Sequence, residues 1–421
     1  MFALYFLASY EKKYKIALAD RSRIVTHSRG GLYVTDQNPI FIPGPTNIPD
    51  RIRNAMNRQT VDHRSPKFSE LFGSVLQDLK TVFKTSKGTV FAFPSTGTGG
   101  WEAAIENTLA PGDKVLAARH GVFSHRWIEM CQRHGLDVEV IESEWGNPAP
   151  AETFAERLAA DKAGAIKAVL VTHNETATGV RSDIAAVRQA LDRAGHGALL
   201  LADGVSSIAS MNFEMDAWGV DVAVSGSQKG FMLPAGLALV AVSEKALELS
   251  RVSKTARCFF DFQEMLKANK AGGYPYTPAL QHFYGLRESL DMLSEEGLDR
   301  VFARHRRAAD AVRAAVSGWG LELCSKSAPH HSDTISAVYV PAGFDSNVLT
   351  DLVLKKYNVS FGIGLGQMNG RAFRIGHLGS ITDTMILGGL ATIEMAMNEL
   401  GYPVALGSGT TAAQQLFAQR S

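Results

Sequence analysis

The chain has 421 residues, enough for two or three domains with a sizeable core. Its 43 Lys and Arg residues balance 42 Asp and Glu residues, so neither a nucleic-acid-binding surface nor an acidic tail is indicated. Three scattered cysteines argue against a disulfide framework or metal site and indicate a reducing, cytoplasmic compartment, and no apolar run reaches the roughly 18 residues of a membrane span.

The first 33 residues show no pattern that would join a core. Residues 2–8 (FALYFLA) are apolar but short, and charged residues follow them, which is unlike a signal peptide. We expect residues 1–33 to be a disordered extension or the product of a start site assigned too far upstream, with a transit peptide as the alternative.

From residue 71 onward, helical and strand patterns alternate. Helices are expected at 71–84, 100–110, 151–163 and 183–195, and strands at 88–94, 113–121, 137–142, 166–175, 198–205 and 220–228. This alternation predicts an α/β fold with a mostly parallel sheet flanked by helices, whose ligands bind at the carboxyl ends of the strands. A long helix at 297–320 leads into a smaller α+β segment. The expected organisation is an arm at 34–60, a large domain at 61–300 and a small domain at 301–421.

A glycine-rich loop follows the first strand of the large domain. Residues 93–100 (FPSTGTGG) join this strand to the helix expected near Trp101. Glycines let backbone N–H groups approach a ligand, and a helix N-terminus favours an anion. The loop therefore resembles a phosphate site, although an ordinary helix-capping loop remains the alternative.

Two ionisable residues stand at the ends of later strands. Asp203 follows the apolar run ALLLA, where a carboxylate is costly without a cationic partner, unless it caps a helix. Lys229 follows the strand DVAV and the turn SGSQ, a place where lysine is otherwise a solvated loop residue. Pyridoxal phosphate accounts for all three features, since it needs a Schiff-base lysine, a carboxylate at its ring nitrogen and a phosphate site.

The same residues lie in motifs that resemble the class V aminotransferases, specifically the serine–glyoxylate and alanine–glyoxylate branch. The motifs are FIPGPTNIP (41–49), FPSTGTGGWEAAIENTLAPGDKV (93–115), VTHNETATGV (171–180), LADGVSS (201–207), SGSQKG (225–230) and FRIGHLGS (373–380). The resemblance extends from about residue 39 to the C-terminus and implies the fold type I of pyridoxal-phosphate enzymes, with a homodimer that shares its active sites.

The resemblance also implies a role for each matching residue. Lys229 forms the Schiff base, Asp203 holds the ring nitrogen, Phe123 stacks on the ring and Thr176 lies near its 3′-oxygen. Thr96, Gly97, Thr98 and Gln228 bind the phosphate, which Tyr276 and Thr277 reach from the neighbouring subunit. Arg374 binds the substrate α-carboxylate, and Gly44, His63 and Arg64 approach the substrate. No metal site is expected.

These roles predict a transaminase that moves the amino group of L-aspartate or L-serine to glyoxylate, giving glycine and oxaloacetate or hydroxypyruvate. Alanine is the alternative donor. A lyase similar to the cysteine desulfurases is a further alternative, although that branch places histidine where this chain has Gln228. A non-catalytic cofactor-binding module would not need Lys229, Asp203 and Arg374 together.

The donor is the least determined part of the prediction. FSHRW (123–127) and CQRHGLDV (131–138) are most similar to the aspartate–glyoxylate branch. His125 and Arg126 follow Phe123, and cationic groups near the far end of the substrate would favour a second carboxylate. We therefore rank aspartate ahead of serine and alanine last. In the alternative arrangement, His125 and Arg126 point away along a helix.

Overall fold

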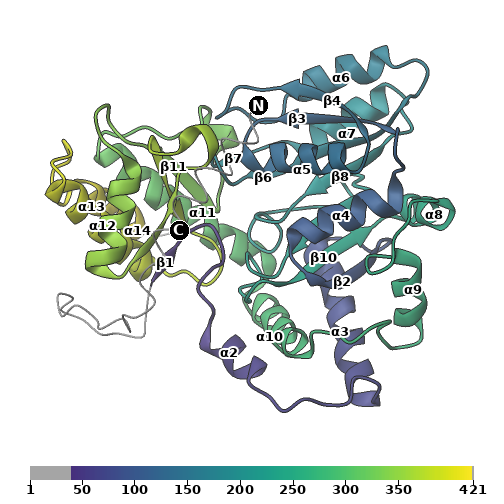
Figure 1. The fold of residues 1–421 in the computed structure, drawn as a ribbon. Coiled ribbons are helices and arrows are strands. Elements are labelled where there is room, and N and C mark those ends of the chain that lie inside the picture. Colours follow the sequence, from purple (N-terminus) through teal and green to yellow (C-terminus); the bar gives the residue numbers. More distant parts are fainter. Residues whose placement is uncertain (1–38, 420–421) are drawn as a thin grey trace, which may run out of the picture. The chain divides into compact units, whose positions relative to one another are not determined.

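The computed structural model describes residues 39–419, so the predictions for residues 1–33 lie outside the described residues. A large sheet has the strand order β2-β10-β9-β8-β5-β3-β4 (Figure 1). Its strands are β2 (Thr89–Ser95), β3 (Lys114–Arg119), β4 (Asp137–Glu142), β5 (Ile166–Thr172), β8 (Leu199–Asp203), β9 (Val222–Gly226) and β10 (Gly236–Val242). Only β10 runs antiparallel to its neighbours, so the other strands of this sheet share one carboxyl edge. The predicted α/β fold is confirmed.

Alternate residues of these strands pack on opposite faces of the large sheet, because side chains alternate along a strand. Leu200 and Ala202 join one apolar cluster, whereas Leu199 and Leu201 join the other. The first cluster includes residues of α3 (Pro66–Phe83), α6 (Ala151–Ala160), α7 (Ile184–Arg193) and α10 (Leu280–Glu296). The second includes residues of α4 (Gly97–Thr108), α5 (Val122–Arg133), α8 (Glu244–Val252) and α9 (Phe262–Lys270). Burial on both faces explains why the strands are continuously apolar.

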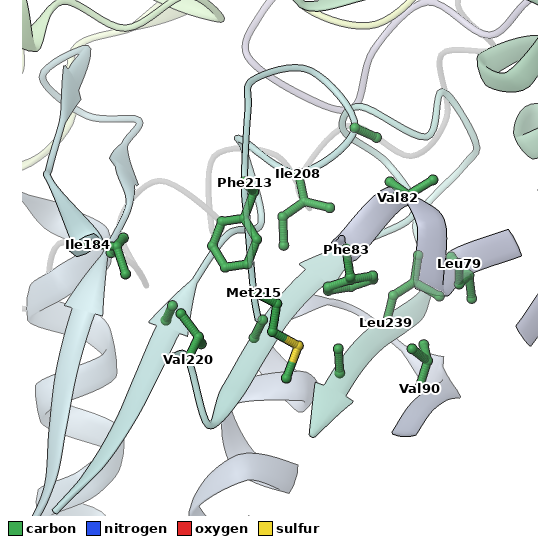
Figure 2. Close-up of a cluster of buried hydrophobic side chains, with 14 of the residues drawn as sticks. Leu79, Val82, Phe83, Val90, Ile184, Ile208, Phe213, Met215, Val220 and Leu239 are labelled. Atoms are coloured by element: carbon green, nitrogen blue, oxygen red, sulfur yellow. The ribbon is translucent and has the colours of Figure 1, made fainter. Parts of the chain in front are cut away.

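The segment that follows Asp203 is anchored on the first of these faces. Figure 2 shows Ile208, Phe213 and Met215 reaching into the cluster that contains Phe83 and Leu239. These side chains are buried, so the segment between β8 and β9 is fixed to the core at several points. This fixes the main chain directly after Asp203 and before the strand β9, which leads to Lys229.

A small sheet has the order β1-β12-β13-β11. Its strands are β1 (Ile40–Phe41), β11 (Ile335–Tyr339), β12 (Ser360–Ile363) and β13 (Ala372–Gly376). A third apolar cluster packs against it from α11 (Leu298–Gly318), α12 (Ser346–Tyr357), α13 (Asp383–Glu399) and α14 (Ser408–Ala418). The remaining elements are α2 (Asp50–Met56), the pair β6 (Asn174–Glu175) and β7 (Val180–Arg181), and short 3-10 helices at Ala328–His330 and Gly366–Met368. No helix within residues 39–419 could cross a membrane.

Most predicted elements occur within a few residues of their expected bounds, and one difference bears on function. Helix α4 begins at Gly97 rather than near Trp101. Glycine is a poor helix former, so the sequence pattern indicates a loop here. Tertiary packing requires the glycines instead: a Cβ on Gly100 would lie 2.5 Å from Val224 Cγ1 of β9. The glycine-rich segment is therefore partly the first turn of a helix.

Candidate active site

Three segments meet at the carboxyl edge of the large sheet. A Cβ on Gly97 would lie 2.5 Å from Val205 Cγ2, in the loop after β8. A Cβ on Gly226, at the end of β9, would lie 3.2 Å from the Gly97 amide nitrogen. Glycine at both positions thus lets the start of α4 contact the loop after β8 and the end of β9.

The predicted phosphate loop forms the N-terminus of α4. Thr96 is the N-cap residue and its side chain makes no capping hydrogen bond, while Thr98 is exposed in the first turn. The first N–H groups of a helix have no partner within the helix, and the helix dipole favours an anion there. Backbone N–H groups and threonine hydroxyls are therefore available together to an anionic ligand.

Lys229 is buried where the chain leaves β9, with 8% of its surface exposed. Its Nζ donates to the carbonyl oxygen of Pro43, and the Thr46 hydroxyl donates to the Lys229 carbonyl at 3.2 Å. A Cβ on Gly44 would lie 2.4 Å from Lys229 Cδ, so glycine is required where the arm passes the lysine. Burial, together with the charge of Arg374, lowers the pKa of Lys229 to about 8. A large share of the amine is thus unprotonated slightly above neutral pH, as a nucleophile requires.

Asp203 is buried at the end of β8 and has no ion pair within residues 39–419. One carboxylate oxygen accepts a hydrogen bond of 2.9 Å from the Val205 amide. Burial raises the pKa of Asp203 to about 7, and the nearby charge of Glu175 acts in the same direction. A carboxylate held at this cost is suited to a cationic ligand, which would restore its charge.

Arg374 reaches this edge from β13 of the small sheet. Its Nη1 donates to the Thr176 carbonyl at 3.2 Å and its Nε donates to the Ile363 carbonyl at 2.8 Å. The side chain is buried, and burial lowers the pKa of Arg374 to about 10. Thr176 is also buried, with its hydroxyl 2.9 Å from Ser206 Oγ. The remaining guanidinium N–H groups can bind a carboxylate in a bidentate manner.

Phe123 lies in the first turn of α5, and the Arg126 guanidinium lies 5.5 Å from the centre of its ring. A cavity of about 470 Å³ adjoins both residues. Its wall also contains Thr98, Trp101, Glu102, Glu129, Met130, Arg133 and His134. The predicted ring-stacking residue and the N-terminus of α4 therefore border one cavity.

Other predicted residues have different neighbours. The Tyr276 hydroxyl donates to the Cys258 carbonyl at 2.8 Å and also to Glu264 of α9. Thr277 is exposed. His63 and Arg64 lie in the segment before α3. The Arg64 amide donates to the Asp62 carboxylate at 2.9 Å, and the Arg64 side chain is exposed. Their predicted roles in a neighbouring subunit stay predictions.

Sequence reasoning gave no role to Glu175 and His120, which the structure places at the same edge. Glu175 is fully buried, and so is His120, whose ring nitrogens have no hydrogen-bond partner in the described chain. Gln228 Oε1, next to Lys229, is buried and equally unpaired among residues 39–419. The available signal for Glu175 was a glutamate at the end of the strand expected at 166–175, since a buried carboxylate must be heavily hydrogen-bonded.

Comparison with known proteins shows which family the chain resembles. The family model described as aminotransferase class-V matches residues 45–364. An L-aspartate–glyoxylate aminotransferase of Paracoccus denitrificans is 58% identical over 386 residues, which cover 92% of this chain and 98% of that protein. A serine–glyoxylate aminotransferase of Hyphomicrobium methylovorum is 56% identical over 384 residues, 91% of this chain and 95% of that protein. The crystal structure of a ureidoglycine–glyoxylate aminotransferase from Bacillus subtilis superposes with a TM-score of 0.87 at 25% identity, covering 92% of this chain and all of that one.

Proposed function

The chain belongs to the class V aminotransferase family, and we propose that it uses pyridoxal phosphate to transfer an amino group from L-aspartate or L-serine to glyoxylate. Similar proteins with these activities match nearly the whole chain. The observation that carries the proposal is the buried Lys229, whose lowered pKa suits a nucleophile and whose strand neighbour Asp203 suits a cationic ring nitrogen.

The residues at the carboxyl edge fit pyridoxal phosphate. The start of α4, from Thr96 to Thr98, would hold the phosphate, and the side-chain NH₂ group of Gln228 would donate to it as well. Asp203 would bind the ring nitrogen, Phe123 would cover one ring face, and Thr176 would lie near the 3′-oxygen. When bound, this coenzyme supplies an aldehyde that takes up the amino group and a ring that accepts the electrons of the broken bond.

The chain's own residues then bind the substrate and move protons. Arg374 holds the α-carboxylate and so directs the α-carbon of the amino acid toward Lys229. Above neutral pH the Lys229 amine is partly unprotonated, so it can remove a proton from that carbon and give a proton back in the next step. Asp203 keeps the ring nitrogen protonated, because its carboxylate is more stable beside a positive charge than alone in the core.

We further infer a homodimer in which Tyr276 and Thr277 contact the partner's phosphate, and His63 and Arg64 approach its substrate. Gly44 supports the same site by allowing the arm to pass Lys229. The domain bounds 34–60, 61–300 and 301–421 belong to this proposal. Its support is that the Tyr276 hydroxyl contacts Cys258 and Glu264 and that the Arg64 side chain is exposed, so neither contacts the site residues of its own chain in the described part.

A lyase similar to the cysteine desulfurases fits less well. Cys131 and Cys324 are buried, and burial raises the pKa of both thiols to about 12. Cys258 is exposed in the segment between α8 and α9, and Gln228 stands before Lys229 where that branch has histidine.

The choice of donor rests on α5. Arg126 lies over the Phe123 ring. Burial lowers the pKa of Arg374, the charge of Glu175 opposes this, and the charge of Arg126 lowers it, so two guanidinium groups act on one region. This favours an amino acid with two carboxylates, which places aspartate first. His125 instead lies 3.7 Å from Glu129 on the same helix.

The proposal is tested with purified protein. We expect a visible absorption band that borohydride removes while attaching the coenzyme covalently to Lys229. We expect glycine to form from glyoxylate with aspartate or serine as donor, and more slowly with alanine. A colourless protein that cannot be reconstituted with pyridoxal phosphate would refute the proposal.

A further inference from the structure

Glu175 is a fully buried carboxylate in the candidate site with no ion pair in the described part of the chain. We propose that Glu175 is a positioning residue that fixes Phe123 and the first turn of α5 against the coenzyme-binding edge of the large sheet. This inference rests on the proposed function and deepens it, because Phe123 is the residue expected to cover the coenzyme ring.

The hydrogen bonds of Glu175 require a carboxylate. Oε1 accepts from the amides of Phe123 at 3.2 Å and Ala177 at 3.1 Å. Oε2 accepts from the Ser124 amide at 2.9 Å and the Ser124 hydroxyl at 3.0 Å. Each oxygen therefore receives two donors. A glutamine would turn an NH₂ group toward one pair of donors, so it could not replace the carboxylate.

The position of the carboxylate explains how its charge is tolerated without an ion pair. The bonded amides of Phe123 and Ser124 belong to the first turn of α5, which has no side-chain cap. A negative charge is stabilised at the N-terminus of a helix, where N–H groups lack partners within the helix. Glu175 thus supplies the cap from a different segment of the chain.

Gly121 is the glycine that makes this arrangement possible. A Cβ on Gly121 would lie 2.2 Å from Glu175 Cδ, well inside van der Waals contact. Any larger residue at this position would displace the carboxylate from the helix start. The close approach of Gly121 and the burial of Glu175 therefore form one structural unit.

Glu175 also joins two parts of the site that are distant in sequence. On one side it bonds the amide of Phe123; on the other it bonds the amide of Ala177, directly after Thr176. The Thr176 carbonyl accepts from Arg374. One carboxylate therefore sets the spacing between the ring-covering residue and the turn that holds the arginine.

A second buried glutamate provides a matched control. Glu394 of α13 accepts from Trp319 Nε1 at 2.7 Å and from the amides of Gly409 at 2.9 Å and Thr410 at 3.2 Å. The Gly407 amide also donates to it. Like Glu175, it is buried and caps a helix start, here that of α14, but its contacts are in the core around the small sheet.

The experiment compares Glu175→Gln with Glu394→Gln. The dissociation constant of pyridoxal phosphate is measured by titrating the coenzyme-free proteins, the visible circular dichroism of the loaded proteins is recorded, and unfolding in urea is followed. Both variants should lower the urea midpoint. Only Glu175→Gln should weaken coenzyme binding, by about tenfold, and reduce the visible circular dichroism.

Coenzyme binding by Glu175→Gln within twofold of wild type, with unchanged circular dichroism, would overturn the inference. So would an equal loss in Glu394→Gln. If Glu175→Gln does not fold, Ser124→Ala removes one donor and leaves the carboxylate in place. It should then weaken coenzyme binding by about threefold, and an unchanged value would be decisive against the inference. If the wild-type protein binds no coenzyme, the proposed function itself fails, which is a distinct result.

Discussion

The two sheets bury ionisable side chains in different ways. Near the small sheet, His305 Nδ1 lies 2.7 Å from the Val301 carbonyl and its Nε2 accepts from the Gly379 amide at 2.9 Å. His377 is likewise bonded at both ring nitrogens, by the Asp333 carbonyl at 3.1 Å and Ser336 Oγ at 3.1 Å. At the carboxyl edge of the large sheet, by contrast, both ring nitrogens of His120 are unpaired within residues 39–419.

The pKa values of these buried groups also differ. Burial lowers the pKa of His305 and His377 to about 3, so both stay neutral and serve only to satisfy the core. Burial brings the pKa of Lys229 to about 8 and that of Asp203 to about 7, which places both near neutral pH. Complete hydrogen bonding does not by itself distinguish the two kinds of group, since Glu175 is fully bonded within the candidate site. A pKa shifted toward neutral pH is what separates Lys229 and Asp203 from these histidines.

Among the substitutions that test this comparison, Lys229→Ala should have the largest effect on activity. It removes both the nucleophile and the group that moves the proton, so kcat/KM should fall by at least about 10⁴-fold. Steady-state transamination measures this loss. His305→Gln, a change among the fully bonded groups, should leave kcat/KM within about threefold once the protein is folded. A Lys229→Ala enzyme with activity near wild type would contradict the assignment of the nucleophile.

The sequence indicates much of this edge, because buried strands end in residues whose chemistry is unexpected there. Asp203 and Lys229 are readable in this way, as are most helices and strands around them. Arg374 arrives from another sheet, and only the family resemblance linked it to the site. Only Ala177, two residues away, could be suspected as a partner of Glu175 from sequence, since its other donors lie at 123 and 124, about 50 residues away in the chain.

Asp203→Asn should separate function from stability. The pKa of this carboxyl is raised in the folded state, from 3.8 to about 7, so the folded coenzyme-free protein binds more protons than the unfolded chain between these values. Wild-type stability therefore falls as the pH rises from about 4 to about 7 and stays low above that. Asparagine avoids the charged form, so the variant should gain up to about 4 kcal/mol at pH 8 and little at pH 4, while transaminase activity drops.

Urea unfolding of the coenzyme-free protein at the two pH values measures this gain. Asp221→Asn is the control, because Asp221 is buried at the other end of β9 and accepts from the Leu200 amide at 2.9 Å and the Ser243 hydroxyl at 2.9 Å. Its replacement should lower stability at both pH values. An Asp203→Asn protein that is no more stable than wild type at pH 8 would show that the carboxylate is already compensated.

Arg374→Lys should have an intermediate effect. Arg374 lies in the small sheet, and its Nη1 donates to the Thr176 carbonyl in the turn between β6 and β7. Lysine keeps the charge but loses the fork that binds a carboxylate at two points, at a cost of about 1.5–3 kcal/mol, or roughly 10- to 150-fold in kcat/KM. Coenzyme affinity should change little, which distinguishes this variant from Glu175→Gln. Equal losses of coenzyme and substrate binding would argue against a role in substrate recognition.

Arg126→Ala should have the smallest effect and bears on the donor. Arg126 is exposed and lies over the Phe123 ring, so water screens its charge and the attraction for a second substrate carboxylate is at most about 1 kcal/mol. We expect kcat/KM for aspartate to fall about fivefold relative to that for serine. Arg64→Ala should act in the same direction if its side chain approaches the partner's substrate. Arg133→Ala is the matched control, since Arg133 lines the same cavity as Arg126, nearly two turns further along α5, and its loss should affect both donors equally.

Equal losses for aspartate and serine in Arg126→Ala would remove the electrostatic argument for aspartate. A wild-type preference for serine of about tenfold, some 1.4 kcal/mol in transition-state binding, would reverse the ranking of donors.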